Sequence, residues 1–301
     1  MTTTSPTRAR RFSATEQKAR AAALHASIID QVEMLRNTDI WRKFLQFSAS
    51  FHEYSLNNVL LILSQRPDAT AVAGHRAWQS KGRQVRSGEH GIHIFGYRVQ
   101  KVAEPNPGNH PDSAENEEAE HKAIARFPIL TVFDIAQTDP IEGETDPTSL
   151  VQELSGTDDF GIVDRLTDHL RTAGWTISRR PLAGGLNGYA DPSRRQVGVK
   201  DTLTPEHAAK TLIHETAHIL LGHTENLADY AHHRGLAETE AESVAYVVAG
   251  LTGFDTSGYS IGYIAGWADA DSTLIASTAT RVLHAVHAIM SILEPTRVAT
   301  D

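Results

Sequence analysis

Residues 211–223 read TLIHETAHILLGH and decide how the second half of this chain folds, because they place an H-E-x-x-H pattern inside an apolar helical repeat. Histidines four residues apart on an α-helix lie on one face, about one turn apart, so the imidazoles of His214 and His218 can reach the same metal ion. Glu215 is then placed to take a proton from a water molecule on that ion. Because the flanking residues predict a buried helix, these polar groups would be costly without a partner. The pattern therefore predicts a metal centre rather than a solvated helix face.

A third protein ligand is expected on the next predicted helix. A catalytic zinc ion takes three protein ligands and leaves a fourth position for water. Residues 235–248, GLAETEAESVAYVV, carry small and apolar residues on one face, and Glu238 and Glu242 lie one turn apart. This arrangement resembles that of the gluzincin metallopeptidases, and the resemblance implies that Glu238 is the third ligand and that Glu242 orients a ligating histidine. Glu240 is the alternative ligand, because helix ends are loose, and a solvated acidic face is the other alternative.

The metal helix has start and stop signals of its own. Thr204 can cap its N-terminus, Pro205 suits the first helical position, and Gly222 suits the C-terminal cap. Three further histidines near the motif are expected at the surface or beside a ligand, rather than on the metal: His223, His232 and His233.

The rest of the second half is predicted from its periodicity. Residues 161–173 read as a helix, and short strands follow at 175–178, 188–190 and 196–199. In metallopeptidases an edge strand beside the metal helix commonly holds an extended substrate by strand addition, and we assign that role to residues 196–199. A last packing helix is expected over residues 272–293.

Composition limits the classes of function. The chain has 301 residues, no cysteine and a formal net charge of -9. Its length allows two domains that each bury a core. Without thiolates, any metal site must use histidine and carboxylate ligands, which fits Zn²⁺, and a cytoplasmic location is expected. No apolar run approaches the length of a membrane span, so no membrane partner is expected. The negative charge argues against wrapping of nucleic acid by the whole chain.

Charge reverses locally in the first half. Helices are predicted over residues 14–36 and 41–52, with a third capped by Ser55, and short strands follow at 72–78 and 84–99. Between residues 71 and 101 a single acidic residue, Glu89, stands against six cations: Arg76, Lys81, Arg83, Arg86, Arg98 and Lys101. The aromatic residues Trp78 and Tyr97 lie among them. Single-strand binders combine cations for phosphates with aromatic faces for bases, whereas a solvated basic loop with structural aromatics is the alternative.

Several segments of this half resemble the N-terminal domain of ArdC-type antirestriction proteins. They are YSLNNVLLI at 54–62, QRP at 65–67, Trp78, GRQVRSGEHGI at 82–92 and VFDIAQT at 132–138. That family pairs a single-stranded-DNA-binding N-terminal domain with a C-terminal zincin-like peptidase domain. The resemblance implies contact with single-stranded DNA through six residues: Asn57, Asn58, Trp78, Lys81, Arg83 and Arg86. The two asparagines can equally serve to tie down the backbone around their helix.

The expected fold class is α+β. N-terminal helices and an antiparallel sheet would make a DNA-binding domain over residues 1–139, with a disordered acidic insert at about 102–123. Residues 140–301 would form a mostly helical, gluzincin-like metallopeptidase domain. The boundary is placed in the acidic stretch at 139–159, which also carries Pro and Gly.

Two functions are compatible with these features. In the first, the protein binds single-stranded DNA on an entering mobile element and protects it from restriction, and its zinc peptidase activity is auxiliary or aimed at a DNA-bound protein. In the second, it resembles the ImmA/IrrE metallopeptidases and cleaves a regulatory protein that the N-terminal domain recognises. A purely structural zinc ion is disfavoured, because such a site has no need for a base at Glu215.

Overall fold

Three helices open the computed structural model, which describes residues 13–103, 121–142, 161–183, 185–223, 225, 227–254 and 271–293. They are α1 (Ala14–Met34), α2 (Thr38–Ser50) and α3 (Leu56–Gln65). Ser13 and Glu16 begin α1 with a capping box, in which each side chain accepts a hydrogen bond from the backbone N–H of the other. Asn37 caps α2 through its side-chain oxygen, so that helix begins at Thr38 rather than at the predicted Trp41.

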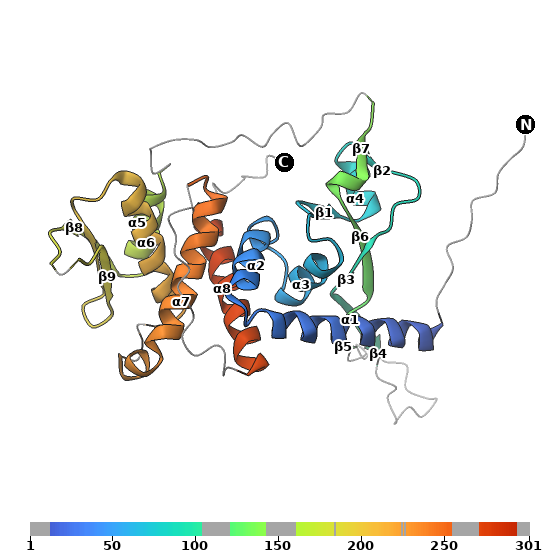
Figure 1. Cartoon of the computed structure of the whole chain (residues 1–301), viewed down its shortest axis with the longest axis horizontal. Helices are drawn as coiled ribbons and strands as arrows, with labels where there is room; N and C mark the ends of the chain where they lie inside the picture. Colours follow the sequence, from blue (N-terminus) through green and yellow to red (C-terminus); the bar gives the residue numbers. More distant parts are fainter. Residues whose placement is uncertain are drawn as a thin grey trace, which may run out of the picture.

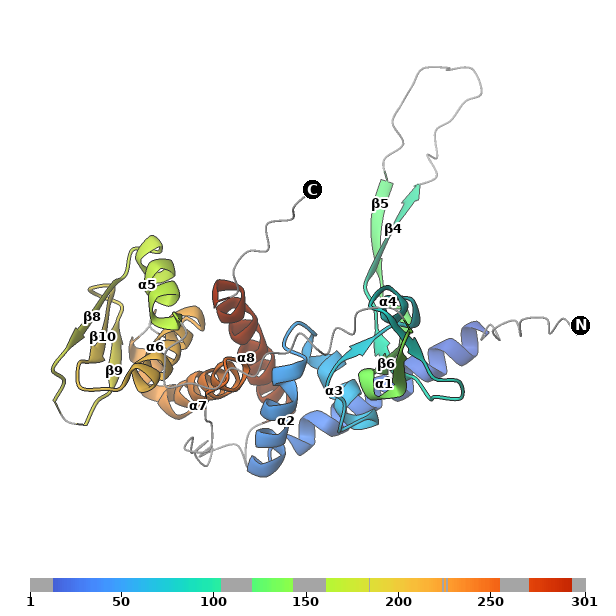
Figure 2. The same ribbon diagram turned by 90° about the horizontal axis from the view of Figure 1, so that it is seen from above.

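Antiparallel strands complete the N-terminal half, as predicted. A three-stranded sheet has the order β1-β6-β3, while β2 pairs with β7 and β4 pairs with β5. The strands are β1 (Val72–Ala73), β2 (Arg83–Val85), β3 (Ile92–Phe95), β4 (Arg98–Ala103), β5 (His121–Arg126), β6 (Ile129–Asp134) and β7 (Thr138–Pro140), with a short 3-10 helix, η1 (Ile135–Gln137), before β7. The β4–β5 hairpin projects from the rest of this half (Figure 2).

Two boundaries in this half differ from the predictions. The strand predicted at 72–78 ends at Ala73, because the next residue, Gly74, is the N-cap of the helix α4 (His75–Ser80). The predicted insert at 102–123 is also too long, since residues 102–103 belong to β4 and residues 121–123 belong to β5. The remainder of the predicted disorder, at 104–120, lies outside the described residues.

In the C-terminal half a small mixed sheet packs beside α5 and α6, and α7 and α8 lie beyond them (Figure 1). Its elements are α5 (Ile162–Thr172), β8 (Thr176–Arg180), β9 (Gly188–Asp191), β10 (Gln196–Lys200), α6 (Pro205–Leu220), α7 (Leu227–Leu251) and α8 (Ser272–Leu293). The sheet order is β8-β10-β9, with β10 parallel to β8 and antiparallel to β9. The whole fold is α+β, as predicted. No helix in the described part of the chain is long and apolar enough to span a membrane.

The strand order corrects the predicted substrate strand. Residues 196–199 lie in β10, which is the central strand, so both of its edges are already bonded to neighbouring strands. The prediction that they form an edge is therefore wrong. The edge strand beside the metal helix α6 is β9.

One apolar core runs through both halves. Trp41, on α2, is fully buried, and its indole N–H donates a hydrogen bond to the hydroxyl of Ser243, on α7, at 3.1 Å. Gln46 and Tyr246 make a second side-chain contact between the same two helices. The buried cluster extends without a break from α1–α3 to α5–α8, which differs from the expectation that each half buries its own core. The predicted domain boundary falls mainly in residues 143–159, outside the described residues, so that division stays a prediction.

Trp41→Ala is expected to lower the free energy of unfolding by about 3–5 kcal/mol, because it empties a fully buried indole site at the junction of the two halves. Urea unfolding followed by circular dichroism measures this loss. The control Leu274→Ala changes a side chain that is 41% exposed on α8 and should stay within about 0.5 kcal/mol of the parent. A loss below about 1 kcal/mol, on the scale of typical point mutants, would show that α2 does not share a core with α7.

Candidate metal centre

Local signals position the helix that carries the H-E-x-x-H motif. The hydroxyl of Thr204 accepts a hydrogen bond from the backbone N–H of His207, and Pro205 takes the first helical position, as predicted. At the other end, Gly222 adopts a left-handed conformation with φ of 73°. The backbone N–H of His223 then donates to the carbonyl of His218 at 3.0 Å, and that of Gly222 donates to the carbonyl of Ile219, which is a Schellman ending. This turn brings His223 back beside α6.

Three ligand atoms converge between α6 and α7. The Nε2 atoms of His214 and His218 lie 3.0 Å apart. One carboxylate oxygen of Glu238, Oε2, lies 3.5 Å from Nε2 of His214 and 3.7 Å from Nε2 of His218. Each of the three residues thus offers one atom to a common point, and they form a candidate metal-binding group.

The residues fit a divalent metal ion in both chemistry and spacing. Imidazole nitrogen and carboxylate oxygen atoms bind zinc at about 2.0–2.2 Å, and tetrahedral ligands at that range lie roughly 3.3–3.6 Å from each other. The spacings of 3.0, 3.5 and 3.7 Å are close to that range. The donor set is therefore suited to a tetrahedral ion with one open position.

Glu242 lies on the far side of the first histidine ring. Its Oε2 is 3.2 Å from Nδ1 of His214, while Nε2 of that ring faces the ligand cluster. A carboxylate on the second ring nitrogen holds the orientation of a ligating imidazole and favours the tautomer with its lone pair toward the metal. The structure thus places Glu242 where the resemblance to gluzincins implied.

A second chain of contacts supports His218. Its Nδ1 lies 3.0 Å from Nδ1 of His223, and Nε2 of His223 lies 2.7 Å from Oε2 of Glu240. The guanidinium of Arg281, on α8, donates to both carboxylate oxygens of Glu240 at 3.0 and 3.2 Å and to the carbonyl of Leu221 at 2.7 Å. We call His223, Glu240 and Arg281 the supporting triad.

Glu240, the alternative third ligand, belongs to the supporting triad. Its buried carboxylate is directed at His223 and Arg281, away from the point where the three ligand atoms meet. The hydrogen bonds from these two partners lower the pKa of Glu240, although burial acts to raise it. Local residue spacing does not predict the role of Arg281, which is 41 residues away along the chain from Glu240. His232 and His233 have side chains outside the described residues.

Glu215 faces a cavity of about 820 Å³ that also opens onto all three ligand residues. Its side chain is 8% exposed. The edge strand β9 comes very close at this point, because a Cβ atom added to Gly188 would lie 2.5 Å from Cγ2 of Thr211 and 3.0 Å from Oε1 of Glu215. Tyr189 and Ala190, from the same strand, line the cavity as well. The carboxylate, the ligand atoms and the edge strand therefore share one space.

The electrostatics of this cluster favour a bound cation. Burial acts to lower the pKa of His214, but hydrogen bonds to Glu238 and Glu242 and the charge of Glu215 outweigh it and raise that pKa to about 9. Burial lowers the pKa of His218. Burial, together with the nearby charge of Glu238, raises the pKa of Glu215 to about 7, although His214 opposes the shift. The carboxylates thus stabilise positive charge where the imidazole nitrogens meet.

Three of the predicted DNA-contacting residues belong to the packing of the N-terminal half. Trp78 is 3% exposed, and its indole N–H donates to the carbonyl of Phe133 at 2.8 Å. The side-chain amide of Asn58 bonds both the N–H and the carbonyl of Phe95, at 2.9 and 2.8 Å, as a neighbouring strand would. Arg83 is buried and donates to the hydroxyl of Thr138 at 2.7 Å. A buried ring cannot stack on a base, so the direct-contact prediction is wrong for Trp78, and Asn58 and Arg83 have structural partners.

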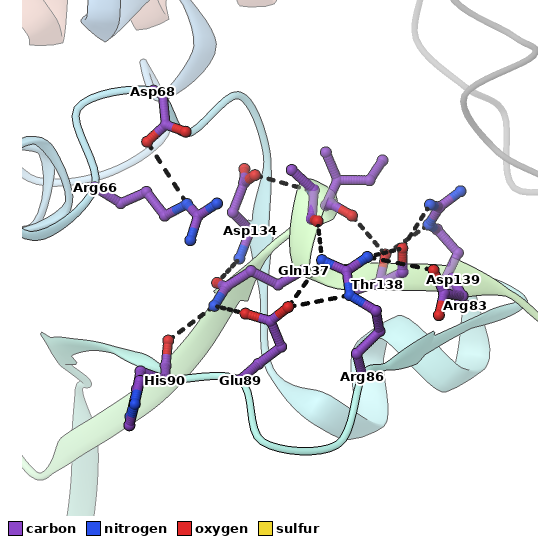
Figure 3. Close-up of polar contacts among 12 residues, drawn as sticks. Arg66, Asp68, Arg83, Arg86, Glu89, His90, Asp134, Gln137, Thr138 and Asp139 are labelled. Atoms are coloured by element: carbon purple, nitrogen blue, oxygen red, sulfur yellow. Dashed lines mark hydrogen bonds and ion pairs between the residues drawn. The ribbon is translucent and has the colours of Figure 1, made fainter.

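The other three predicted residues are exposed. Arg86 is held by an ion pair with Glu89 at 2.8 Å and a second with Asp139 at 3.3 Å (Figure 3). These contacts raise the pKa of Arg86. The hydrogen bond from Gln137, followed by that from Arg86, lowers the pKa of Glu89. Lys81 places its ammonium group 5.9 Å from the centroid of the Trp78 ring, and Asn57 faces solvent on α3. The structure does not bring the six residues together into one cluster.

Figure 3 shows what this polar network does for the fold. Gln137 donates from its side-chain amide to the carboxylate of Glu89 and to the carbonyl of His90, and its carbonyl oxygen accepts from the backbone N–H of Asp134. The network ties the loop after β2 to the turn between β6 and β7. The segment VFDIAQT at 132–138 therefore closes this half by holding the loop after β2 in place.

Comparison with known proteins identifies the N-terminal part. Residues 18–133 match the family model of the N-terminal domain of anti-restriction factor ArdC, and this match confirms the resemblance for this part. The matched range ends before α6 begins, so it does not include the H-E-x-x-H motif. An uncharacterized protein of Bacillus anthracis is 27% identical over 248 residues, which are 73% of this chain; the chain spans 42% of that relative's length.

Two solved structures are also similar to this chain. They are crystal structures of the antirestriction ArdC protein from the R388 plasmid, one described as metal-free and the other as Mn(II)-bound. Each is 19% identical to this chain, with TM-scores of 0.46 and 0.44. The metal-free structure is matched over 78% of this chain and 84% of its own, and the Mn(II)-bound one over 80% and 89%.

Proposed function

The N-terminal part of this chain matches the N-terminal domain of anti-restriction factor ArdC, and from that premise we propose that the chain binds single-stranded DNA there and hydrolyses peptide bonds at a divalent-metal centre in its C-terminal half. The convergence of His214, His218 and Glu238 beside the buried Glu215 carries the peptidase proposal. We propose Zn²⁺ as the ion, held by these two histidines and Glu238. Glu242 and the supporting triad hold the two imidazole rings in place.

The mechanism follows from the position of Glu215. A bound ion would act as a Lewis acid and would lower the pKa of a water molecule beside it towards about 7. Glu215 then accepts the proton of the attacking water and afterwards gives it to the leaving amine. Glu215 lies in the same cavity as the ligand atoms, so its carboxylate is close to the reacting groups. Because Glu215 is buried, few water molecules surround it. A base in this position has no use at a purely structural site.

We propose that the substrate is an extended peptide that adds to strand β9. This strand is at the edge of its sheet, lines the cavity and has no second strand partner among the described residues. Strand addition would supply backbone hydrogen bonds and lay the scissile carbonyl along α6. The contact of Gly188 with Thr211 and Glu215 sets how deep such a peptide can lie.

The antirestriction role of the matched family leads us to propose that the N-terminal part engages single-stranded DNA. Because the apolar core is continuous, the test uses the full chain rather than separate halves. Fluorescence anisotropy with single-stranded and duplex oligonucleotides across a salt series measures both preference and phosphate contacts. Preferential binding of single strands supports the proposal. No binding at low salt would overturn it and would favour cleavage of a regulatory protein by the same centre.

Glu240→Gln is expected to lower the affinity for Zn²⁺ by about 10–100-fold, although Glu240 is not itself a proposed ligand. The substitution removes the charge that faces His223 and Arg281, and so loosens the ring that supports His218. Competition with a chromophoric chelator measures the affinity in the purified protein. Glu225→Gln, an exposed glutamate beyond the end of α6, serves as the control. Equal affinities in these two variants would contradict a role for the supporting triad at the metal centre.

A further inference from the structure

An exposed pair of aromatic rings lies at the base of the β4–β5 hairpin. Tyr97 precedes β4 and Phe127 follows β5, and these side chains are 70% and 63% exposed. The ring centroids are 5.7 Å apart, with 55° between the ring planes. Among the large hydrophobic side chains exposed in the described part of the chain, these are the only aromatic ones. An apolar pair with so much free surface contributes little to the core and suggests a binding role.

The backbone holds this pair in register. The N–H of Gly96 donates to the carbonyl of Pro128 at 2.8 Å, and Arg98 lies opposite Arg126 in the β4–β5 ladder. The residues between these two links therefore face each other across the hairpin. The approach at Gly96 is close, because an added Cβ atom would lie 2.6 Å from Cδ1 of Leu130. The two rings thus lie directly next to the paired ends of β4 and β5.

The strands above the pair are basic. They carry Arg98 and Lys101 on β4 and Lys122 and Arg126 on β5, with no acidic residue on either strand, in a chain whose net charge is -9. The acidic residues of this region stand in the linking segment at 104–120. Positive charge beside exposed rings matches the chemistry of a nucleic-acid strand, whose bases offer flat faces and whose backbone is anionic.

We propose that Tyr97 and Phe127 form a base-stacking platform for single-stranded DNA, and that Arg98 and Arg126 meet the flanking phosphates. This inference rests on the DNA binding proposed above, and it places the contact on the hairpin rather than on Trp78, whose ring is buried. The platform requires unpaired bases, because the base faces in a duplex are already stacked. Figures 1 and 2 show the hairpin on the N-terminal half, away from the sheet that borders the metal centre.

The test is a double-mutant cycle, in which the rings are removed from the protein and bases are removed from the DNA. Fluorescence anisotropy measures the affinity of the full chain for a thymine oligonucleotide and for the same oligonucleotide with abasic sites. The double variant Tyr97→Ala/Phe127→Ala is expected to bind the thymine strand about 5- to 150-fold more weakly. Abasic sites should weaken binding by the parent protein and leave the double variant unaffected. Tyr97→Trp should keep the affinity, because it keeps a ring face.

The salt dependence of the affinity for DNA distinguishes the phosphate contacts of the arginines from stacking on the rings. Arg98→Gln/Arg126→Gln should reduce the dependence of affinity on salt, by a slope of about 1 for each phosphate that an arginine no longer neutralises, whereas the ring variants should keep the parent slope. Ile29→Ala, another exposed hydrophobic residue of this half, is the matched control. If the parent binds single strands and the ring variant binds them equally well, the platform is overturned and the DNA proposal stands. If the parent binds no single strands, both are overturned.

Discussion

Glu215→Gln is expected to lower the rate of peptide hydrolysis by about 10²–10⁴-fold and to leave metal binding nearly unchanged. Glutamine has the same shape as glutamate but cannot accept a proton at neutral pH. The three ligand atoms come from other side chains, so the group that would hold the ion is retained. The effect should fall on the turnover number rather than on substrate affinity, because the missing interaction belongs to proton transfer.

Two measurements on the same preparation check this result. A quenched fluorescent peptide library reports hydrolysis by the zinc-loaded protein, and mass spectrometry of the native protein reports its metal content. Glu225→Gln is again the control, since it removes an exposed carboxylate that does not line the cavity. Full turnover by the Glu215 variant would sink the mechanism. Loss of both metal and turnover would show instead that Glu215 acts on the metal directly.

Glu238→Ala should reduce the affinity for Zn²⁺ by more than the roughly 10–100-fold that loss of an outer partner costs, because it removes one of three protein ligands. Glu242→Ala should stay within that range of about 10–100-fold, since its carboxylate meets Nδ1 of His214 rather than the point where the ligand atoms converge. Glu238 is thus expected to have the largest effect of the three glutamates on α7.

Chelator competition on the three variants measures this order directly. Glu238→Ala should bind most weakly, with Glu242→Ala and Glu240→Gln between it and the parent protein. Removing metal from the parent with a chelator, and then restoring Zn²⁺ or Mn²⁺, tests which ion supports hydrolysis. An order in which Glu242→Ala binds metal more weakly than Glu238→Ala would exchange the two assignments.

Local rules predicted the parts of the candidate site that lie within one helix. The spacing of His214 and His218 sets them on one face of α6 for any helix that forms there. Thr204, Pro205 and Gly222 act at the helix ends as predicted, because caps depend on neighbouring residues only. The Schellman ending also brings His223 beside His218, and this position follows from the Gly222 signal.

Other expectations failed or stayed open where packing between distant elements decides. The order of strands β8, β10 and β9 depends on long-range pairing, so residues 196–199 were wrongly expected at an edge. Burial decided the position of Trp78 and Arg83, for which the resemblance to ArdC-type proteins had implied contact with DNA. The same applies to the core, which Trp41 and Ser243 join across 202 residues of sequence.

The sequence by itself determined the helix that carries the H-E-x-x-H motif, the position of the proposed base Glu215 within it and the match of the first part to the ArdC N-terminal domain, because each depends on residue types at short spacings. Only the tertiary structure decided which glutamate of α7 reaches the point between the Nε2 atoms of His214 and His218, since this depends on how α7 is rotated relative to α6. It also supplied Arg281, which local spacing could not reveal, because α8 meets α7 only when the shared core is packed.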